Sequence, residues 1–173
     1  MERLRSERKV AWSYGTGLGV FAGCQAVGVW FPAVKLEVFC RAASWLAAGF
    51  LAAPRVETES GFLLDHPRIA VHVVEACSGY DFFSLLYAVL CAIAVRYAAR
   101  VGLQLFILLP VAVGLTLAAN TARIVCAVDA RVLCAWLPAG PSAEAMHLAV
   151  GVFVFVTILA ASCHATRILY AKS

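Results

Sequence analysis

The chain has 173 residues, of which 63% are hydrophobic and only 14% are charged. A soluble domain of this size cannot bury that much apolar surface, so the composition predicts an integral membrane protein, a single domain over residues 1–173 with about four or five spanning helices. The net charge of +4 is small and clustered, so it indicates how the helices are oriented in the membrane and argues against a nucleic-acid-binding surface.

The cysteines do not form a metal-binding or redox pattern. They are scattered at Cys24, Cys40, Cys77, Cys91, Cys126, Cys134 and Cys163. No C-x-x-C pair occurs, so neither a zinc site nor a thioredoxin-like motif is supported. Most of these thiols are expected to be small packing groups in apolar helices, and no metal or cofactor is expected.

The N-terminal part consists of a basic cluster and two apolar runs. Residues 3–9 hold four basic side chains, and Val10–Phe31 is uncharged and long enough to span a bilayer. This run is too long for the apolar part of a secretory signal peptide, so an uncleaved helix is expected. The second run, Leu36–Ala53, contains Glu37 and Arg41.

The middle of the chain is polar, and the C-terminal part is apolar again. Ile69–Val74 is short and β-branched, so it predicts a strand or extended segment that leads directly into Glu75. The apolar runs that follow are Asp81–Val95, Val101–Ala119 and Ile124–Leu137. A last helix is predicted from Ser142, a good N-cap residue, to about His164.

Basic residues on short loops favour the cytoplasmic side and so predict the topology. With residues 3–9, Arg96/Arg100 and Arg167/Lys172 all inside, the spans are 10–31, 81–95, 101–120 and 143–165. The segment Leu36–Ala53 then becomes an interfacial or re-entrant helix on the outer face, because its charges would be costly at mid-bilayer. The expected fold is therefore an all-α polytopic transmembrane bundle with a short extracytoplasmic extended segment before Cys77.

Three chemically useful side chains reach the same depth in this topology. Each is separated by about one membrane thickness from a basic residue at the other end of its span: Cys77 by 19 residues from Arg96, Arg123 by 23 from Arg100, and His147 by 20 from Arg167. At about 1.5 Å per residue these separations are roughly 28–35 Å, close to the ~30 Å hydrocarbon core. All three are therefore predicted near the outer membrane face.

A thiol, an imidazole and a guanidinium at one depth suit acyl transfer. His147 can take the proton of the Cys77 thiol, and Arg123, which stays protonated, can stabilise an oxyanion. The backbone amides of Ser78 and Gly79 could add donors at the start of the helix. The first product would be a thioester on Cys77, which water or another nucleophile would resolve.

Each of these side chains also has a plainer interpretation. A cysteine before a helix is often structural, an arginine at a helix end often extends to lipid headgroups, and a histidine there is often merely polar. His72 is a rival base, and Glu144 is a candidate to orient His147. Neither Glu75 nor Asp81 is expected to face the sulfur, because a nearby carboxylate would oppose a thiolate.

At these residues the sequence resembles the exosortase/archaeosortase family. The similarity rests on Glu75-Ala76-Cys77-Ser78-Gly79, on Asn120-Thr121-Ala122-Arg123, and on His147 at the start of the last helix. It covers roughly residues 60–165. The chain is short for the family, and it resembles the compact type called exosortase K.

The resemblance implies a cysteine protease or transpeptidase in a bacterial or archaeal cytoplasmic membrane, with its active site on the extracytoplasmic side. It implies Cys77 as the nucleophile, Arg123 as the oxyanion-stabilising or acid group, and His147 as the histidine of the site. Supporting positions are Glu75, Ser78, Gly79 and Asn120. The substrates would be secreted proteins with a C-terminal motif such as Pro-Glu-Pro, a transmembrane helix and a basic tail.

Two other functions stay open on the residues alone. A non-enzymatic polytopic protein, such as an assembly subunit or a small transporter, would use charges paired across helices, for example Arg123 with Glu144. A thiol–disulfide protein would use Cys77 with Cys126 or Cys134.

Overall fold

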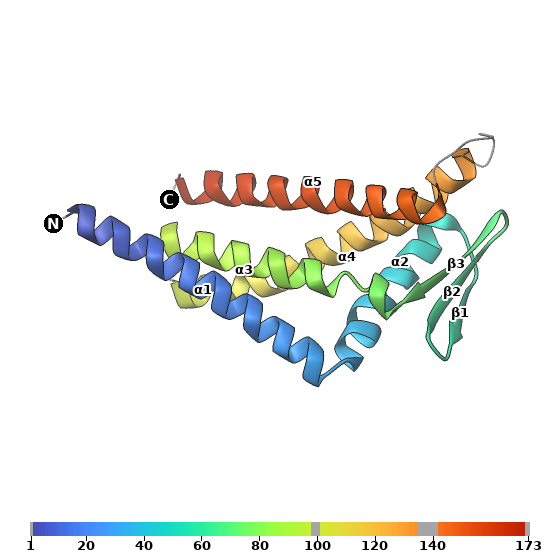
Figure 1. Ribbon diagram of the computed structural model, residues 1–173, viewed down its shortest axis with the longest axis horizontal. Coiled ribbons are helices and arrows are strands. Elements are labelled where there is room, and N and C mark those ends of the chain that lie inside the picture. Colours follow the sequence, from blue (N-terminus) through green and yellow to red (C-terminus); the bar gives the residue numbers. More distant parts are fainter. Residues whose placement is uncertain (1, 98–100, 135–141, 172–173) are drawn as a thin grey trace. The chain divides into compact units, whose positions relative to one another are not determined.

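The computed structural model describes residues 2–97, 101–134 and 142–171, without the side chains of residues 2–6, 101, 134, 143 and 144 (Figure 1). The elements in chain order are α1 (Glu2–Trp30), η1 (Val34–Cys40, a π-helical segment), α2 (Arg41–Leu51), β1 (Arg55–Thr58), β2 (Gly61–His66), β3 (Ile69–Val74), η2 (Glu75–Cys77, a 3₁₀ turn), α3 (Tyr80–Tyr97), α4 (Val101–Cys134) and α5 (Ala143–Ala171). They form two compact units, and α4 and α5 contribute segments to both.

The helices confirm the predicted all-α polytopic fold. Among the described residues, three segments are long and apolar enough to cross a membrane: Glu75–Tyr97, Gly102–Leu133 and Ala145–Tyr170. A fourth crossing results if Glu7–Trp30 and Val34–Leu51 together form one broken span. The Leu36–Ala53 run is therefore helical, as expected, and its interfacial or re-entrant placement stays a prediction.

The end predicted for the third helix was wrong, whereas the end of its membrane span stays a prediction. Helix α4 does not stop at Asn120 but runs unbroken for 34 residues to Cys134. No glycine or proline interrupts residues 117–134, and Asn120 and Thr121 each cost less than about 0.7 kcal/mol of helix propensity. Asn120 and Arg123 therefore lie three residues apart on one helix face instead of at a helix end.

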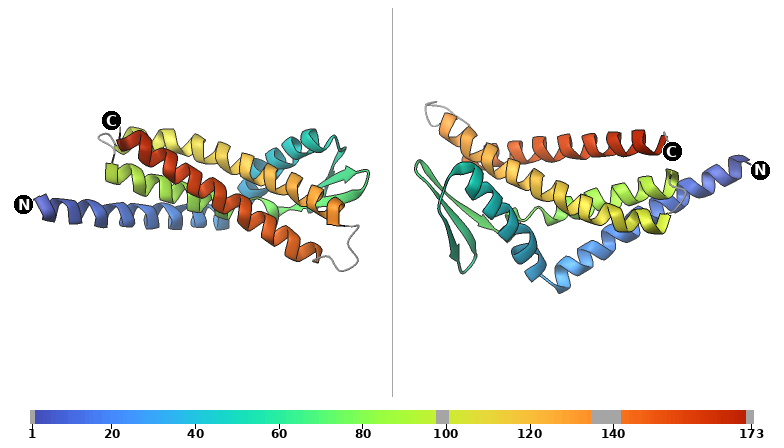
Figure 2. Two further views of the ribbon diagram at one scale, coloured as in Figure 1. Left: turned by 90° about the horizontal axis from the view of Figure 1, so that it is seen from above. Right: turned by 180° about the vertical axis from the view of Figure 1, so that it is seen from behind.

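Unit 1 contains α1, most of α3, the first part of α4 and the last part of α5. Figure 2 shows α1 running along α3. The approach is close at Gly17, where an added Cβ would lie 3.2 Å from the Ala92 Cβ. Side-chain hydrogen bonds join the helices: Gln25 Nε2 donates to Asp81 Oδ1 at 3.3 Å, Tyr87 Oη to the Leu105 carbonyl at 3.2 Å, and Tyr170 Oη to Gln104 Oε1 at 3.0 Å.

Unit 2 is built on a three-stranded antiparallel sheet in the order β1-β2-β3. The sequence pattern predicted only the β3 segment, which pairs with β2 so that Phe62 faces Val73 and Leu64 faces Val71. Helix α2 lies beside the sheet (Figure 1). The shared core consists of Cys40, Ala43, Ala47, Phe62, Leu64, Val73 and, from α4, Ile124.

The two charges that argued against a span at Leu36–Ala53 pair on the surface of unit 2. Arg41 Nε lies 2.7 Å from Glu37 Oε2, and Arg41 Nη2 lies 2.9 Å from Glu57 Oε1 on β1. Exposed ion pairs of this kind contribute little to stability, because solvent screens them. The pair with Glu57 joins α2 to β1, the edge strand opposite to β3.

Candidate active site

Cys77 lies in the tight connection between β3 and α3, entirely within unit 2. Strand β3 ends at Val74, the turn η2 follows, and α3 begins at Tyr80. Gly79 closes the connection with φ +73°, a left-handed conformation that residues with a Cβ adopt at a cost. An added Cβ at Gly79 would also lie 3.3 Å from Asn120 Cγ. Two independent constraints therefore require glycine two residues after the cysteine.

Ser78 completes this turn through its own backbone and side chain. Its N–H donates to the Glu75 carbonyl at 2.9 Å, and its hydroxyl accepts from the Tyr80 N–H at 3.2 Å. The predicted use of the Ser78 amide as an oxyanion donor does not fit this arrangement, because that amide is already engaged. The serine instead caps the first turn of α3.

Segment η1 fixes the residues on both sides of Cys77. Three contacts contribute: Cys40 Sγ donates to the Val74 carbonyl at 3.2 Å, Lys35 Nζ pairs with Glu75 Oε1 at 3.3 Å, and Phe39 packs edge-to-face on Tyr80 with ring centroids 5.4 Å apart. The Glu75 carboxylate is thus paired with Lys35.

Helix α4 holds the cysteine backbone through Asn120. The fully buried Asn120 donates from Nδ2 to the Cys77 carbonyl at 2.6 Å. Its Oδ1 is buried and has no hydrogen-bond partner in the described part of the chain. Leaving the Oδ1 of a buried amide without a hydrogen-bond partner costs free energy. The hydrogen bond to Cys77 and the close fit against Gly79 nevertheless hold the Asn120 side chain in this position.

One helical turn further along α4, Arg123 contacts His147 of α5. Arg123 Nη2 lies 2.6 Å from His147 Nε2, and both side chains are half-buried. A guanidinium has only donors, so Nε2 is the accepting nitrogen of the ring. The Arg123 side chain also lies over Phe155 at 5.5 Å, and an added Cβ at Gly151 would lie 3.1 Å from Arg123 Nε. The Arg123 side chain therefore lies against one face of α5, which is formed by His147, Gly151 and Phe155 at four-residue spacing.

Cys77 and His147 line the same cavity of about 170 Å³ in unit 2. Its remaining walls are residues 70–73 of β3 and Ile124, Ala127, Val128 and Arg131 of α4. Arg123 is not in the lining and reaches the cavity through His147. The volume is below the roughly 300–1,000 Å³ of a small-molecule site, so it suits a short stretch of peptide more than a free cofactor.

The sequence matches the protein family described as transmembrane exosortase (Exosortase_EpsH) over residues 25–163, which is most of the chain. The chain belongs to this family. Exosortases are cysteine transpeptidases as a family, so this exosortase is a multi-pass membrane protein with a transpeptidase-like role. No curated protein and no solved structure matches it. The resemblance to exosortase K stays a prediction.

The other residues singled out in the sequence of this exosortase have different outcomes in the structure. His72 also lines the cavity, but it is exposed and its Nε2 lies 2.9 Å from Thr58 Oγ1. The Glu144 side chain and the Cys134 thiol lie outside the described residues. The six described cysteines are all free thiols, and the described residues contain no group of three metal-ligating side chains. Arg131 was not predicted as a site residue, although it is a charge within an apolar run.

Replacing Gly79 by alanine is expected to lower the stability of this exosortase by about 1–2 kcal/mol, the cost of a left-handed conformation for an L-residue. The new Cβ would also press on Asn120 and displace the Cys77 carbonyl. We therefore expect a lower temperature of thermal unfolding in detergent together with reduced activity. Thermal unfolding measured by intrinsic fluorescence checks this directly.

The matched control is Gly49→Ala, in helix α2 of the same unit. An added Cβ there meets nothing within 4 Å. Alanine in a helix is favoured over glycine by about 1 kcal/mol, so the control should be neutral or slightly stabilising. Equal unfolding temperatures for the two variants would contradict the role of Gly79.

Proposed function

We propose that this exosortase cleaves and transfers secreted proteins through a thioester on Cys77, with His147 as the base and Arg123 as the group that stabilises the oxyanion. The observation that carries the proposal is the face of α4 on which Asn120 and Arg123 lie. Asn120 holds the Cys77 carbonyl and Arg123 holds His147, so one rigid helix sets the thiol and the imidazole around a shared cavity. Such positioning is what a nucleophile–base pair needs.

The resting contact between Arg123 and His147 determines how the reaction begins. Nε2 cannot accept a proton from Cys77 while it accepts the hydrogen bond of Arg123. The scissile carbonyl oxygen, entering the cavity, competes for the same donor. Because Arg123 does not line the cavity at rest, its guanidinium must turn from Nε2 toward this oxygen as the substrate enters. This movement would free the base and bring a positive charge to the developing oxyanion.

The covalent steps require only the substrate's peptide bond and one acceptor nucleophile. His147 takes the thiol proton, and the Cys77 sulfur attacks the carbonyl carbon to give a tetrahedral oxyanion beside Arg123. The C–N bond breaks, and His147 returns the proton to the leaving amine. An amine, a hydroxyl or a water molecule next attacks the thioester, loses a proton to His147 and releases the Cys77 thiol.

The proposed substrates are secreted proteins that end in a short motif, a transmembrane helix and a basic tail. A basic tail end stays on the cytoplasmic side, as do the enzyme's own basic clusters in the predicted topology. The scissile bond would then lie at the outer interface, at the depth of Cys77. A cavity of about 170 Å³ accommodates a short piece of extended chain there.

The reaction is tested with a secreted reporter protein that carries such a C-terminal signal, expressed with and without this exosortase. Intact-mass spectrometry of the reporter should show loss of the tail only when the enzyme is present. A further mass addition at the new C-terminus would indicate transfer, and its absence would indicate hydrolysis. An identical C-terminus in both cells, for every reporter with this signal architecture, would count against the proposal.

A non-enzymatic role would leave these contacts as structural pairings, and the Arg123–His147 contact by itself fits that role as well. The two roles differ in whether the Cys77 thiol is needed for processing. Alkylation of Cys77 in the native protein should abolish processing of the reporter if this thiol is the nucleophile. Full processing by protein in which Cys77 is completely alkylated would favour the structural role.

A further inference from the structure

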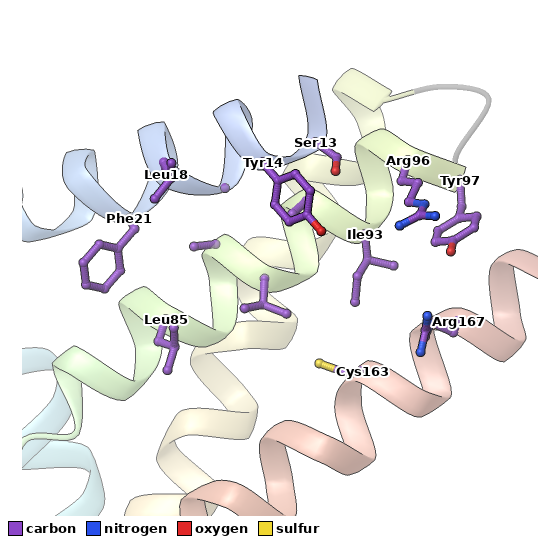
Figure 3. A pocket seen from close by; sticks show the side chains of 14 residues that line it. Ser13, Tyr14, Leu18, Phe21, Leu85, Ile93, Arg96, Tyr97, Cys163 and Arg167 are labelled. Carbon is purple, nitrogen blue, oxygen red and sulfur yellow. The ribbon is translucent and has the colours of Figure 1, made fainter. Parts of the chain in front are cut away.

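A second and larger cavity lies in unit 1, between helices α1, α3 and α5 (Figure 3). Its volume is about 610 Å³, within the range of ligand sites. Most of the wall is apolar, as at Leu18, Phe21, Leu85 and Ile93. None of the lining residues plays a part in the proposed chemistry, so a ligand in this cavity would be separate from the reacting groups.

One end of this cavity is positively charged. Figure 3 shows Arg96 and Arg167 at the same end, with Tyr97 between them, whereas Phe21 and Leu85 lie toward the other end. Both arginines are exposed, and within the described residues neither forms an ion pair with a carboxylate. Two guanidinium groups at the mouth of an apolar groove favour an anion attached to a long apolar chain.

The length of the groove matches one leaflet of a bilayer. Arg96 and Leu85 are 11 residues apart on α3, which corresponds to about 16 Å. This is roughly half of the ~30 Å hydrocarbon core. An acyl chain that starts at a phosphate on the arginines would therefore reach the middle of the membrane along this wall.

We propose that this groove binds an anionic phospholipid of the leaflet in which Arg96 and Arg167 lie, with the phosphate held by the two arginines and an acyl chain along α1 and α3. Basic pockets between transmembrane helices are suited to anionic headgroups. The charge also argues against the other apolar occupant, the transmembrane tail of a substrate, because its basic end would meet two arginines. Lipid binding is independent of the chemistry at Cys77.

Cys163 provides a native reporter, because it lines the groove and is half-buried. In purified protein in detergent, phosphatidylglycerol should slow alkylation of Cys163, while phosphatidylcholine at the same concentration should do so much less. Cys126, which is exposed in unit 2, should be labelled at the same rate throughout. Equal protection of Cys163 by both lipids, or no protection by either, would overturn the proposal.

The charge requirement is tested with the double variant Arg96→Gln/Arg167→Gln. Each basic residue near an anionic headgroup contributes about a factor of five in affinity, so phosphatidylglycerol should bind about 25-fold more weakly. The matched control, Arg8→Gln/Arg68→Gln, removes the same charge away from the groove and should bind normally. Equal weakening in both double variants would show a general charge effect and would overturn the site.

Two further experiments test lipid binding if the arginine double variant is unstable. Val89→Phe places a ring in the groove without changing the charge, and it should abolish the protection of Cys163 by phosphatidylglycerol. A transmembrane peptide with a basic tail should not protect Cys163. Protection by that peptide and not by phosphatidylglycerol would overturn lipid binding in favour of a substrate-tail site.

Discussion

Cys77→Ser is expected to lower the rate of C-terminal processing by at least about 1,000-fold, the scale of loss when an enzyme's nucleophile is removed. Serine is close in size to cysteine and can keep the turn, whose hydrogen bonds come from Ser78, Asn120 and the backbone. Its hydroxyl is far harder to ionise than a thiol, so attack on the carbonyl should fail. The measurement is single-turnover processing of a substrate peptide in detergent or nanodiscs.

Cys126→Ser is the matched control, because Cys126 is an exposed thiol on α4 that does not line the cavity. Its rate should equal that of the wild type, and both variants should unfold at the wild-type temperature. Processing by Cys77→Ser at a wild-type rate would remove Cys77 as the nucleophile.

Arg123→Gln is expected to lower the rate by about 100- to 1,000-fold, the effect of losing one oxyanion-stabilising donor. Glutamine keeps an amide donor but loses the charge and the reach to His147. The effect should fall on kcat more than on KM, because the oxyanion exists only in the transition state. His147→Gln should be similarly impaired, and the double variant should be little worse than either single variant.

His72→Gln separates the rival base from His147, since both line the cavity. It should retain activity close to that of the wild type. A loss of activity with His72→Gln that matches or exceeds the loss with His147→Gln would identify His72, on β3, as the base.

Gly151→Ala tests the position of Arg123 without touching its chemistry. The new Cβ would lie 3.1 Å from Nε, so the guanidinium must shift by a few tenths of an ångström. Misplacement by about 1 Å can cost roughly 100-fold in rate, so a loss of about tenfold is expected. Gly114→Ala, with nothing within 4 Å of its added Cβ, should be silent.

The sequence predicted the helical membrane fold and named the three side chains that now define the candidate site. It did so because apolar length and the placement of charges are one-dimensional properties. The predicted length of helix α4 was too short. Asn120, Thr121 and Arg123 resemble the polar end of a helix as long as their partners are unknown. In the structure their polarity is explained by contacts with Cys77 and His147.

The supports of the site could not be read from the sequence. The contacts of Lys35 and Cys40 with the residues before Cys77 join positions 34–40 residues apart, and no local pattern encodes them. Strands β1 and β2 were missed because the pairing of β1 with β2, and of β2 with β3, depends on the register of the sheet. Gly151 looks like an ordinary helix glycine until Arg123 is placed against it.

An acyl-enzyme on Cys77 is the most direct sign of thioester catalysis. A reaction with substrate peptide is quenched in acid, digested and analysed by mass spectrometry. The substrate's new C-terminus should be found linked to Cys77, should be released by hydroxylamine, and should be missing in His147→Gln. Turnover without any adduct on Cys77, or with the adduct on another cysteine, would contradict the proposed mechanism.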